Sequence, residues 1–193
     1  MNSIHHNRLM VNALDKIDKK VVDNADFDGS PYLEDKFLPS KIEGEDGTHL
    51  LRYNIYNDEI VLRKDDEYFK VPKEGLEYFN IDNKYNIVLI DGKYYVQVSD
   101  IVNKYSVLKK ESVRFIDAKP SENSYDQARK ARFVKNRPDY FLYDRNNGKL
   151  IPFKKNDLEI AFSDKKDLIG KISKKNKLKS DEDYKDFFSE LIK

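Results

Sequence analysis

The sequence predicts an α+β fold: a mostly antiparallel, curved or barrel-like sheet of consecutive hairpins, with two or three C-terminal helices and a short N-terminal helix. The first observation is that apolar and polar residues alternate over much of 50–153, which is typical of strands. The second is that the corners Asp91-Gly92 and Asn146-Asn147-Gly148 interrupt this alternation. The third is a change to helical spacing after residue 153. Consecutive hairpins favour antiparallel neighbours because parallel strands need long crossover connections.

The composition predicts a folded chain with an aromatic core. Charged residues make up 37% of the 193 residues and apolar residues 39%, yet 13 Tyr, 11 Phe and a net charge of +1 argue against disorder. The chain has no Cys, which excludes disulfides, thiolate zinc sites and cysteine nucleophiles. No apolar run approaches the about 20 residues of a transmembrane helix, so no transmembrane segment is expected.

A chain of this length suits one core. We expect a single domain over residues 29–193, β-rich in 36–153 and helical in 156–193, after an N-terminal helical or flexible segment over 1–28. Within that segment, apolar residues at intervals of four, three and four predict an amphipathic helix over 9–21. The residues of this stripe are Met10, Leu14, Ile17 and Val21.

The strands are expected in a regular series. Gly29-Ser30-Pro31-Tyr32 predicts a turn before the first of them. Pro39 lacks a backbone donor, so 37–42 is predicted to be a short edge segment. Further strands are expected at 51–56, 60–62, 68–71, 85–90, 93–98, 105–108, 113–116, 132–134, 140–143 and 149–153. Pro152 indicates an edge position for the last strand, and 117–130 is predicted to be a loop or a short helix.

Three helix starts follow the sheet. Asn156 is expected to cap a short helix that holds Leu158, Ile160 and Phe162, and 163–167 resembles a second start. Ser180 with Asp183 predicts a capping box for the last helix. Behind it, apolar residues at 184, 187, 188, 191 and 192 form one stripe, and the acidic first turn suits the helix dipole.

The charge is unevenly distributed along the chain. Residues 1–100 carry 13 Lys and Arg against 20 Asp and Glu, whereas 101–193 carry 23 against 15. Either the two halves complement each other in the fold, or one charged face meets a partner. The strongest basic stretch, 126–155, has nine cations against three Asp and is interleaved with Phe and Tyr. Such strands can simply alternate inward aromatics with outward charges, or they can bind nucleic acid, another polyanion, an acidic protein or an anionic headgroup.

No catalytic residue, metal ligand or cofactor is predicted. His5 and His6 belong to a start that resembles a tag remnant, and His49 stands alone in a polar stretch. Asp58 with Asp91 and Lys93 could mimic the carboxylates and lysine of a magnesium-dependent nuclease. A tight Asp-Gly hairpin also explains Asp91 without any catalytic role. A metal-dependent hydrolase that uses these carboxylates is therefore the third hypothesis.

Two N-terminal motifs resemble those of a known group of proteins. The motifs are Gly29-Ser30-Pro31-Tyr32-Leu33, followed by Phe37, Pro39 and Ile42, and the run Leu51-Arg52-Tyr53-Asn54-Ile55-Tyr56-Asn57-Asp58-Glu59. They resemble small exported proteins of unknown function from Bacteroidota, which also tend to end in a Lys-rich helical tail. No enzymatic activity is known for such proteins, and the resemblance implies a periplasmic or outer-membrane-associated location. Such proteins normally carry a signal peptide or a lipid anchor, and the present N-terminus has no apolar stretch of that kind.

The candidate binding residues come from the first motifs and from the basic strands. They are Tyr32, Arg52, Asn54 and Tyr56, and Arg132, Lys135 and Arg137. If the strand face of Arg52 is buried, its guanidinium needs a carboxylate such as Asp58 or Glu59, and if it is exposed, Arg52 and Tyr56 suit a protein interface. We expect a non-enzymatic envelope protein that binds another protein or an envelope assembly. A polyanion or nucleic-acid module using 126–155 is the alternative, and peripheral membrane association stays open.

Overall fold

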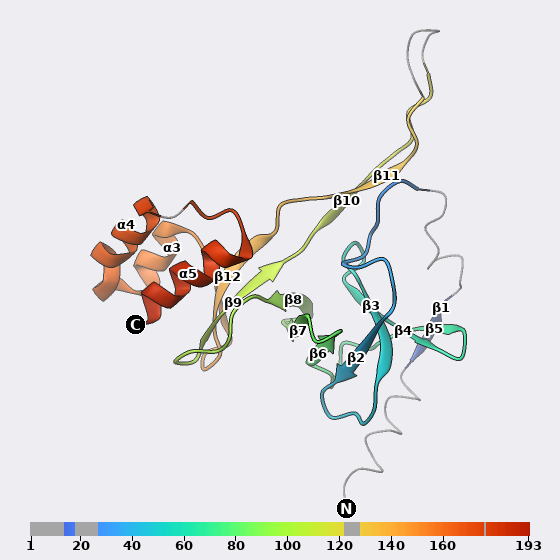
Figure 1. Ribbon diagram of the computed structural model, residues 1–193, viewed down its shortest axis with the longest axis horizontal. Helices are drawn as coiled ribbons and strands as arrows, with labels where there is room; N and C mark the ends of the chain where they lie inside the picture. The colour runs from blue at the N-terminus through green and yellow to red at the C-terminus, as the bar shows by residue number, and fades with distance from the viewer. Residues whose placement is uncertain (1–13, 18–26, 122–127, 176) are drawn as a thin grey trace, which may run out of the picture. The chain divides into compact units, whose positions relative to one another are not determined.

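The computed structural model describes residues 14–17, 27–121, 128–175 and 177–193 (Figure 1). The chain divides into two compact units. The first unit comprises the chain up to Tyr94 together with Glu111–Arg137, and the second comprises Tyr95–Lys110 with Pro138–Lys193. The domain boundary expected between residues 28 and 29 stays a prediction.

The strands confirm a mostly antiparallel sheet. In the first unit they follow the order β1 (Asp15–Ile17), β5 (Glu67–Lys70), β4 (Glu59–Lys64), β3 (His49–Asn54), β2 (Leu38–Ile42), β6 (Tyr78–Ile81), β7 (Tyr85–Ile90) and β8 (Lys93–Gln97). In the second unit β8 continues to β9 (Tyr105–Lys110), β12 (Asp139–Asp144) and β13 (Lys149–Pro152). No described ladder joins β1 to β13, so the barrel-like closure expected as one possibility is wrong and the sheet is open.

The N-terminal helix expected over 9–21 is wrong where the structure describes it. Asp15–Ile17 form strand β1, and the other residues of that prediction, apart from Leu14, lie outside the described part. β1 pairs antiparallel with β5, placing Lys16 opposite Phe69. The reason is a long-range one: β5 would otherwise leave a row of unpaired backbone groups at the sheet edge, and pairing with β1 satisfies them.

Strand β2 lies inside the sheet and not at its edge. It pairs with β3 on one side and with β6 on the other. The β2–β6 register begins only at Ser40, opposite Ile81, and the Pro39 carbonyl accepts from the Asp82 N–H at 2.8 Å. The missing donor of Pro39 therefore falls where β6 has already ended, so an interior strand tolerates the proline.

The two predicted corners are confirmed, and one strand within the expected β-rich region 36–153 was missed. Asp91 and Gly92 have φ angles of 48° and 71°, as a tight hairpin between β7 and β8 requires. Asn147 and Gly148 lie in the turn between β12 and β13, and β13 is the terminal strand, as Pro152 predicted. The missed strand is β6, which buries Phe79 and Ile81 on one face.

The β9–β12 ladder spans a long insertion in the sequence. Its register runs from Tyr105 opposite Asp144 to Lys110 opposite Asp139. Between Lys110 and Asp139 the chain makes the separate two-stranded sheet of β10 (Val113–Ile116) and β11 (Arg132–Lys135). Of the predicted loop or short helix at 117–130, the described residues form an antiparallel bridge between Lys119 and Arg129.

Three α-helices cover the core of the second unit, as predicted. They are α3 (Lys155–Ala161), α4 (Lys166–Lys175) and α5 (Asp181–Ile192), and the 3₁₀ turn η1 (Ser163–Lys165) leads into α4. The Ser180 capping box is confirmed, since the Asp183 N–H donates to Ser180 Oγ and the Ser180 N–H donates to Asp183 Oδ2. The Asn156 cap is wrong, because α3 begins at Lys155 after Lys154 without a side-chain cap. Ile160 is 79% exposed.

The first turn of α5 is tied to the sheet of its own unit by an ionised carboxylate. Asp181 accepts from Lys109 Nζ at 2.8 Å and from Tyr140 Oη at 2.6 Å. Burial raises the pKa of Asp181, but the bonds from Lys109 and Tyr140 outweigh it, so the pKa lies below its usual value of 3.8. The Tyr140 ring also stacks on that of Tyr184 at 3.5 Å between centroids.

This arrangement predicts an acid-sensitive contribution to stability. The carboxyl binds its proton less readily in the folded state, so its contribution is complete above a pH of 3.8 and is lost as the pH falls through the lowered pKa. We expect Asp181→Asn to lower the free energy of unfolding by about 1 kcal/mol at neutral pH and to flatten its decline below about pH 4. Denaturant titrations of both proteins across this pH range measure the difference. An equally steep decline in the variant would contradict this role of Asp181.

Candidate functional site

Three of the predicted binding residues are buried in the first unit. Tyr32, Arg52 and Asn54 are 2%, 9% and 7% exposed. The Arg52 guanidinium carbon lies 3.5 Å from the Tyr32 ring centroid and 4.4 Å from that of Phe37, and Nη1 donates to the Asp35 carbonyl at 2.8 Å. Arg52 is thus buried, as in the first of its two alternatives, but the carboxylates expected beside it bond elsewhere: Asp58 to Tyr53 and Lys73, and Glu59 to Lys70. Contact with two aromatic faces and a carbonyl fixes the turn at 30–37 onto β3.

Arg52 therefore has a measurable role in folding. We expect Arg52→Ala to lower the free energy of unfolding by about 2 kcal/mol, because a desolvated cation–π contact and a charge-assisted hydrogen bond are both lost. Arg52→Lys should recover only part of this, since an ammonium does not stack as a planar guanidinium does. Chemical denaturation measures both variants. A stable Arg52→Ala protein that has lost a binding partner would instead make Arg52 a docking residue.

Asp58 is the centre of a polar cluster and shows no metal-binding geometry. Its carboxylate accepts from Tyr53 Oη at 2.7 Å and from Lys73 Nζ at 2.8 Å, and Lys73 also donates to the Gly92 carbonyl. Burial, followed by the Asp58 charge, raises the pKa of Tyr53. Among the described residues no group of three His, Asp or Glu is placed to hold a metal ion. The described structure therefore offers no cluster of metal ligands that would support the nuclease hypothesis for Asp58, Asp91 and Lys93.

The sheet of β10 and β11 carries an exposed aromatic cluster, and we call these two strands with Phe27 and Tyr56 the arm. Figure 1 shows the two strands running side by side. Phe115 lies opposite Phe133 in the register, with ring centroids 4.9 Å apart. Phe27 packs edge-on against both rings, and Tyr56 packs against Phe133 at 5.3 Å. Phe27 is 39% exposed and Tyr56 50%, so the cluster reaches solvent.

A close backbone contact just after Phe27 holds this residue in the cluster. Asp28 bridges to Arg132, with its N–H donating to the Ala131 carbonyl and its carbonyl accepting from the Phe133 N–H. Gly29 follows with a φ of 74°, and a Cβ there would lie 2.3 Å from the Phe133 carbonyl oxygen. Only glycine allows this approach, and it fixes Phe27 against β11.

The arm is rich in exposed cations. Arg114 and Arg132 lie on the face opposite the aromatic rings, whereas Lys135 shares the aromatic face, as the alternation along each strand requires. Lys135 Nζ donates to the Leu33 carbonyl at 3.1 Å. Arg137 follows the end of β11 and is exposed. The predicted cations Arg132 and Lys135 thus belong to one small sheet but to its two faces.

Sequence reasoning missed Phe27, Arg114 and Phe115. Phe27 reaches the arm through the contact of Asp28 with β11, which lies more than a hundred residues further along the chain. No local pattern signals such a contact. The basic stretch 126–155 is also divided between the two units at Arg137, so its two parts belong to different compact bodies.

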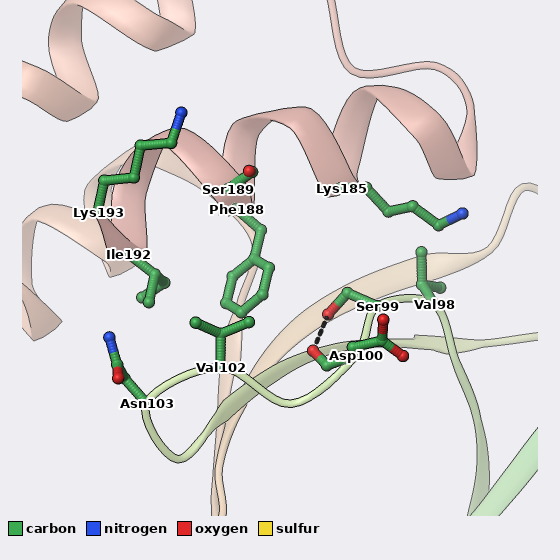
Figure 2. A pocket seen from close by; sticks show the side chains of 10 residues that line it. All are labelled: Val98, Ser99, Asp100, Val102, Asn103, Lys185, Phe188, Ser189, Ile192 and Lys193. Carbon is green, nitrogen blue, oxygen red and sulfur yellow. Dashed lines mark hydrogen bonds between the residues drawn. The ribbon is translucent and has the colours of Figure 1, made fainter.

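The second unit has a shallow pocket between α5 and the loop that joins β8 to β9 (Figure 2). Its volume is about 630 Å³, and in Figure 2 Phe188 of α5 points toward Val102 of the loop. The Ser99 hydroxyl donates to the Asp100 carbonyl and accepts from the Val107 N–H, so it fixes the loop. The lining holds charges of both signs, from Asp100, Lys185 and Lys193, and selects no class of ligand.

The chain matches no protein-family model, no curated protein sequence and no solved structure in the three comparisons. No described helix combines the length and the apolar character needed to cross a membrane.

Proposed function

We propose that the chain is a non-enzymatic protein-binding subunit and that the arm is its docking surface. The observation that carries this is the solvent-reaching aromatic cluster of Phe27, Tyr56, Phe115 and Phe133 on one face of the arm, with exposed arginines on the opposite face. Aromatic and arginine side chains concentrate the binding energy of protein interfaces. A fixed backbone contact at Gly29 holds Phe27 in place before binding, which lowers the entropy cost of forming a complex.

The ring geometry favours a protein over a nucleic acid. A single-stranded nucleic acid stacks its bases on open aromatic faces. Phe27 meets Phe115 at an interplanar angle of 89° and Phe133 at 84°, and Tyr56 meets Phe133 at 70°. In these edge-on contacts each pair uses the face of one ring, so the cluster offers ring edges and apolar area more than free faces.

A site-specific photo-crosslinker in place of Tyr56 tests the proposal in cells that produce the natural protein. We expect one reproducible protein adduct, because Tyr56 is half exposed at the cluster. The matched control carries the same crosslinker in place of Ile160, an exposed apolar residue of the second unit. Phe27→Ala should reduce the Tyr56 adduct and leave the Ile160 background unchanged. Equal labelling from both positions would refute a docking role for the arm.

We propose the cell envelope as the location, either periplasmic or at the outer membrane. The support is the resemblance of the motifs at residues 29–42 and 51–59 to small exported proteins. Fractionation of cells that express the complete natural gene tests it directly. Recovery of the protein in the cytosolic fraction would overturn the location while leaving the docking surface to be judged by the crosslinking result.

A further inference from the structure

The outer edge of β10 presents backbone groups that its own sheet does not use. The Asn136 N–H donates to the Ser112 carbonyl, so these two opposite residues form a hydrogen-bonded pair. Hydrogen-bonded and non-hydrogen-bonded pairs alternate along an antiparallel ladder. The backbone groups of Arg114 and Ile116 therefore bond to β11. The N–H and C=O groups of Val113 and Phe115 then face away from β11. On the other edge of the sheet the Phe133 N–H points outward and donates to the Asp28 carbonyl, which agrees with this alternation.

Only one of the two edges is covered within the described residues. The edge of β11 is occupied by the Asp28 bridge, whereas in the described part of the chain β10 pairs with β11 alone. Exposed sheet edges are templates for an added strand. The free edge of β10 is flanked by chemically different faces: the aromatic face with Phe115 on one side and the cationic face with Arg114 on the other.

We propose that an extended acidic segment of a partner protein adds to this edge as a further strand next to β10. This inference rests on the proposed docking function of the arm and names its ligand. Main-chain hydrogen bonds to Val113 and Phe115 hold the segment, while its alternate side chains contact the aromatic face and the cationic face of the arm. The segment carries Glu or Asp toward Arg114 and Arg132, and apolar side chains toward the aromatic cluster.

The charges of the arm disfavour the most direct competitor, a second copy of β10. Strands β10 and β11 carry Arg114, Arg132 and Lys135 and no acidic residue. Pairing two copies edge to edge would bring Arg114 and its neighbours against like charges, which is destabilising. An acidic strand replaces that repulsion with attraction across the same positions.

The first test uses the full chain and a ten-residue probe peptide of alternating Glu and Val. Two N-methylated versions carry methyl groups on the odd or on the even residues. Since alternate N–H groups of a strand point to opposite edges, we expect one version to bind at least about tenfold more weakly and the other to bind nearly as the parent. Equal binding of all three peptides in fluorescence anisotropy would overturn strand addition.

Variants of the protein localise the site. Val113→Pro removes an outward N–H and leaves the bonds to β11 in place, so we expect about tenfold weaker peptide binding, whereas Val113→Ala keeps the donor and should change binding less than about twofold. Arg114→Glu should weaken binding of the Glu-Val peptide and strengthen binding of a Lys-Val peptide. Hydrogen exchange of the Phe133 amide shows whether each variant keeps the arm folded. If Val113→Pro binds as well as Val113→Ala with this amide protected, the edge is not the site.

The outcomes separate this inference from the docking function on which it depends. A specific Tyr56 adduct together with peptide binding that ignores N-methylation would keep the docking function and refute strand addition. Heparin or single-stranded RNA that displaces the peptide at equal charge concentration would refute an acidic protein segment in favour of a polyanion. Dimers in sedimentation that depend on Val113 would refute it in favour of a second copy.

Discussion

Gly29→Ala is expected to release Phe27 from the arm. The new Cβ would lie 2.3 Å from the Phe133 carbonyl oxygen, a distance that real Cβ atoms do not reach, and the φ of 74° is unfavourable for alanine. Either the Asp28 bridge breaks or β11 shifts. We expect the free energy of unfolding to fall by about 3 kcal/mol. The local signature is faster hydrogen exchange of the Phe133 amide, which donates to Asp28.

Gly92→Ala provides the matched control for this experiment. Gly92 has nearly the same φ, 71°, but nothing lies within 4 Å of a Cβ built there. Alanine at this position therefore carries only the backbone strain, about 1–2 kcal/mol, and keeps the carbonyl that Lys73 uses. The difference between the two variants isolates the steric contact. If both lose the same stability and the Phe133 amide stays protected, the close approach of Gly29 to β11 does not exist.

Phe187→Ala is expected to have the largest effect in the second unit. The ring is 1% exposed and packs edge-on against Phe153 at 5.3 Å. Truncating a fully buried phenylalanine leaves a cavity and typically lowers the free energy of unfolding by about 3–5 kcal/mol. Guanidinium titration followed by near-ultraviolet circular dichroism measures the loss, since the unit contains several buried Tyr and Phe rings.

Two further variants set the scale for that measurement. Phe187→Leu retains most of the buried volume and should lose less than about 2 kcal/mol. Ile160→Ala changes a side chain that is 79% exposed on α3, and should stay within about 0.5 kcal/mol of the parent. A Phe187→Ala protein as stable as Ile160→Ala would show that α5 does not pack on the sheet as described.

Local signals in the sequence predicted those elements whose cause is local. The Asp91-Gly92 corner needs two positive φ angles, and few other sequences supply them. The Ser180 box and the apolar stripe behind it define α5 by contacts within one turn or one helix face. In each case the residues that decide the structure are adjacent in the sequence, so the pattern contains the whole explanation.

The elements that were predicted wrongly depend on partners far along the chain. β1 is a strand because β5 offers it an edge, although the spacing of Leu14 and Ile17 is helical. β2 is interior because β6 reaches it, and the end of β6 decides that Pro39 is tolerated. Intrinsic spacing is a weak preference that such tertiary contacts override.

The candidate site was predictable to the same limited extent. The cationic character of β11 is visible in Arg132 and Lys135, but the aromatic cluster needs Phe27, which only the register of the Asp28 bridge brings there. Arg52 has the residue type of an interface anchor, yet Tyr32 and Phe37 enclose it. Residue type alone does not separate a buried stacked arginine from an exposed one, because the same contacts stabilise both.

The pairing of Lys110 with Asp139 at the end of the β9–β12 ladder has a consequence for how the sequence of this protein can vary. The chain leaves the second unit after Lys110 and returns to it at neighbouring Asp139. The segment between these residues can therefore lengthen, shorten or change its residues while β9 and β12 stay hydrogen-bonded to each other. A tight two-residue connection could close the gap in its place. The residues between Lys110 and Asp139 can thus diverge among descendants of such a gene without disturbing the core that holds Phe187.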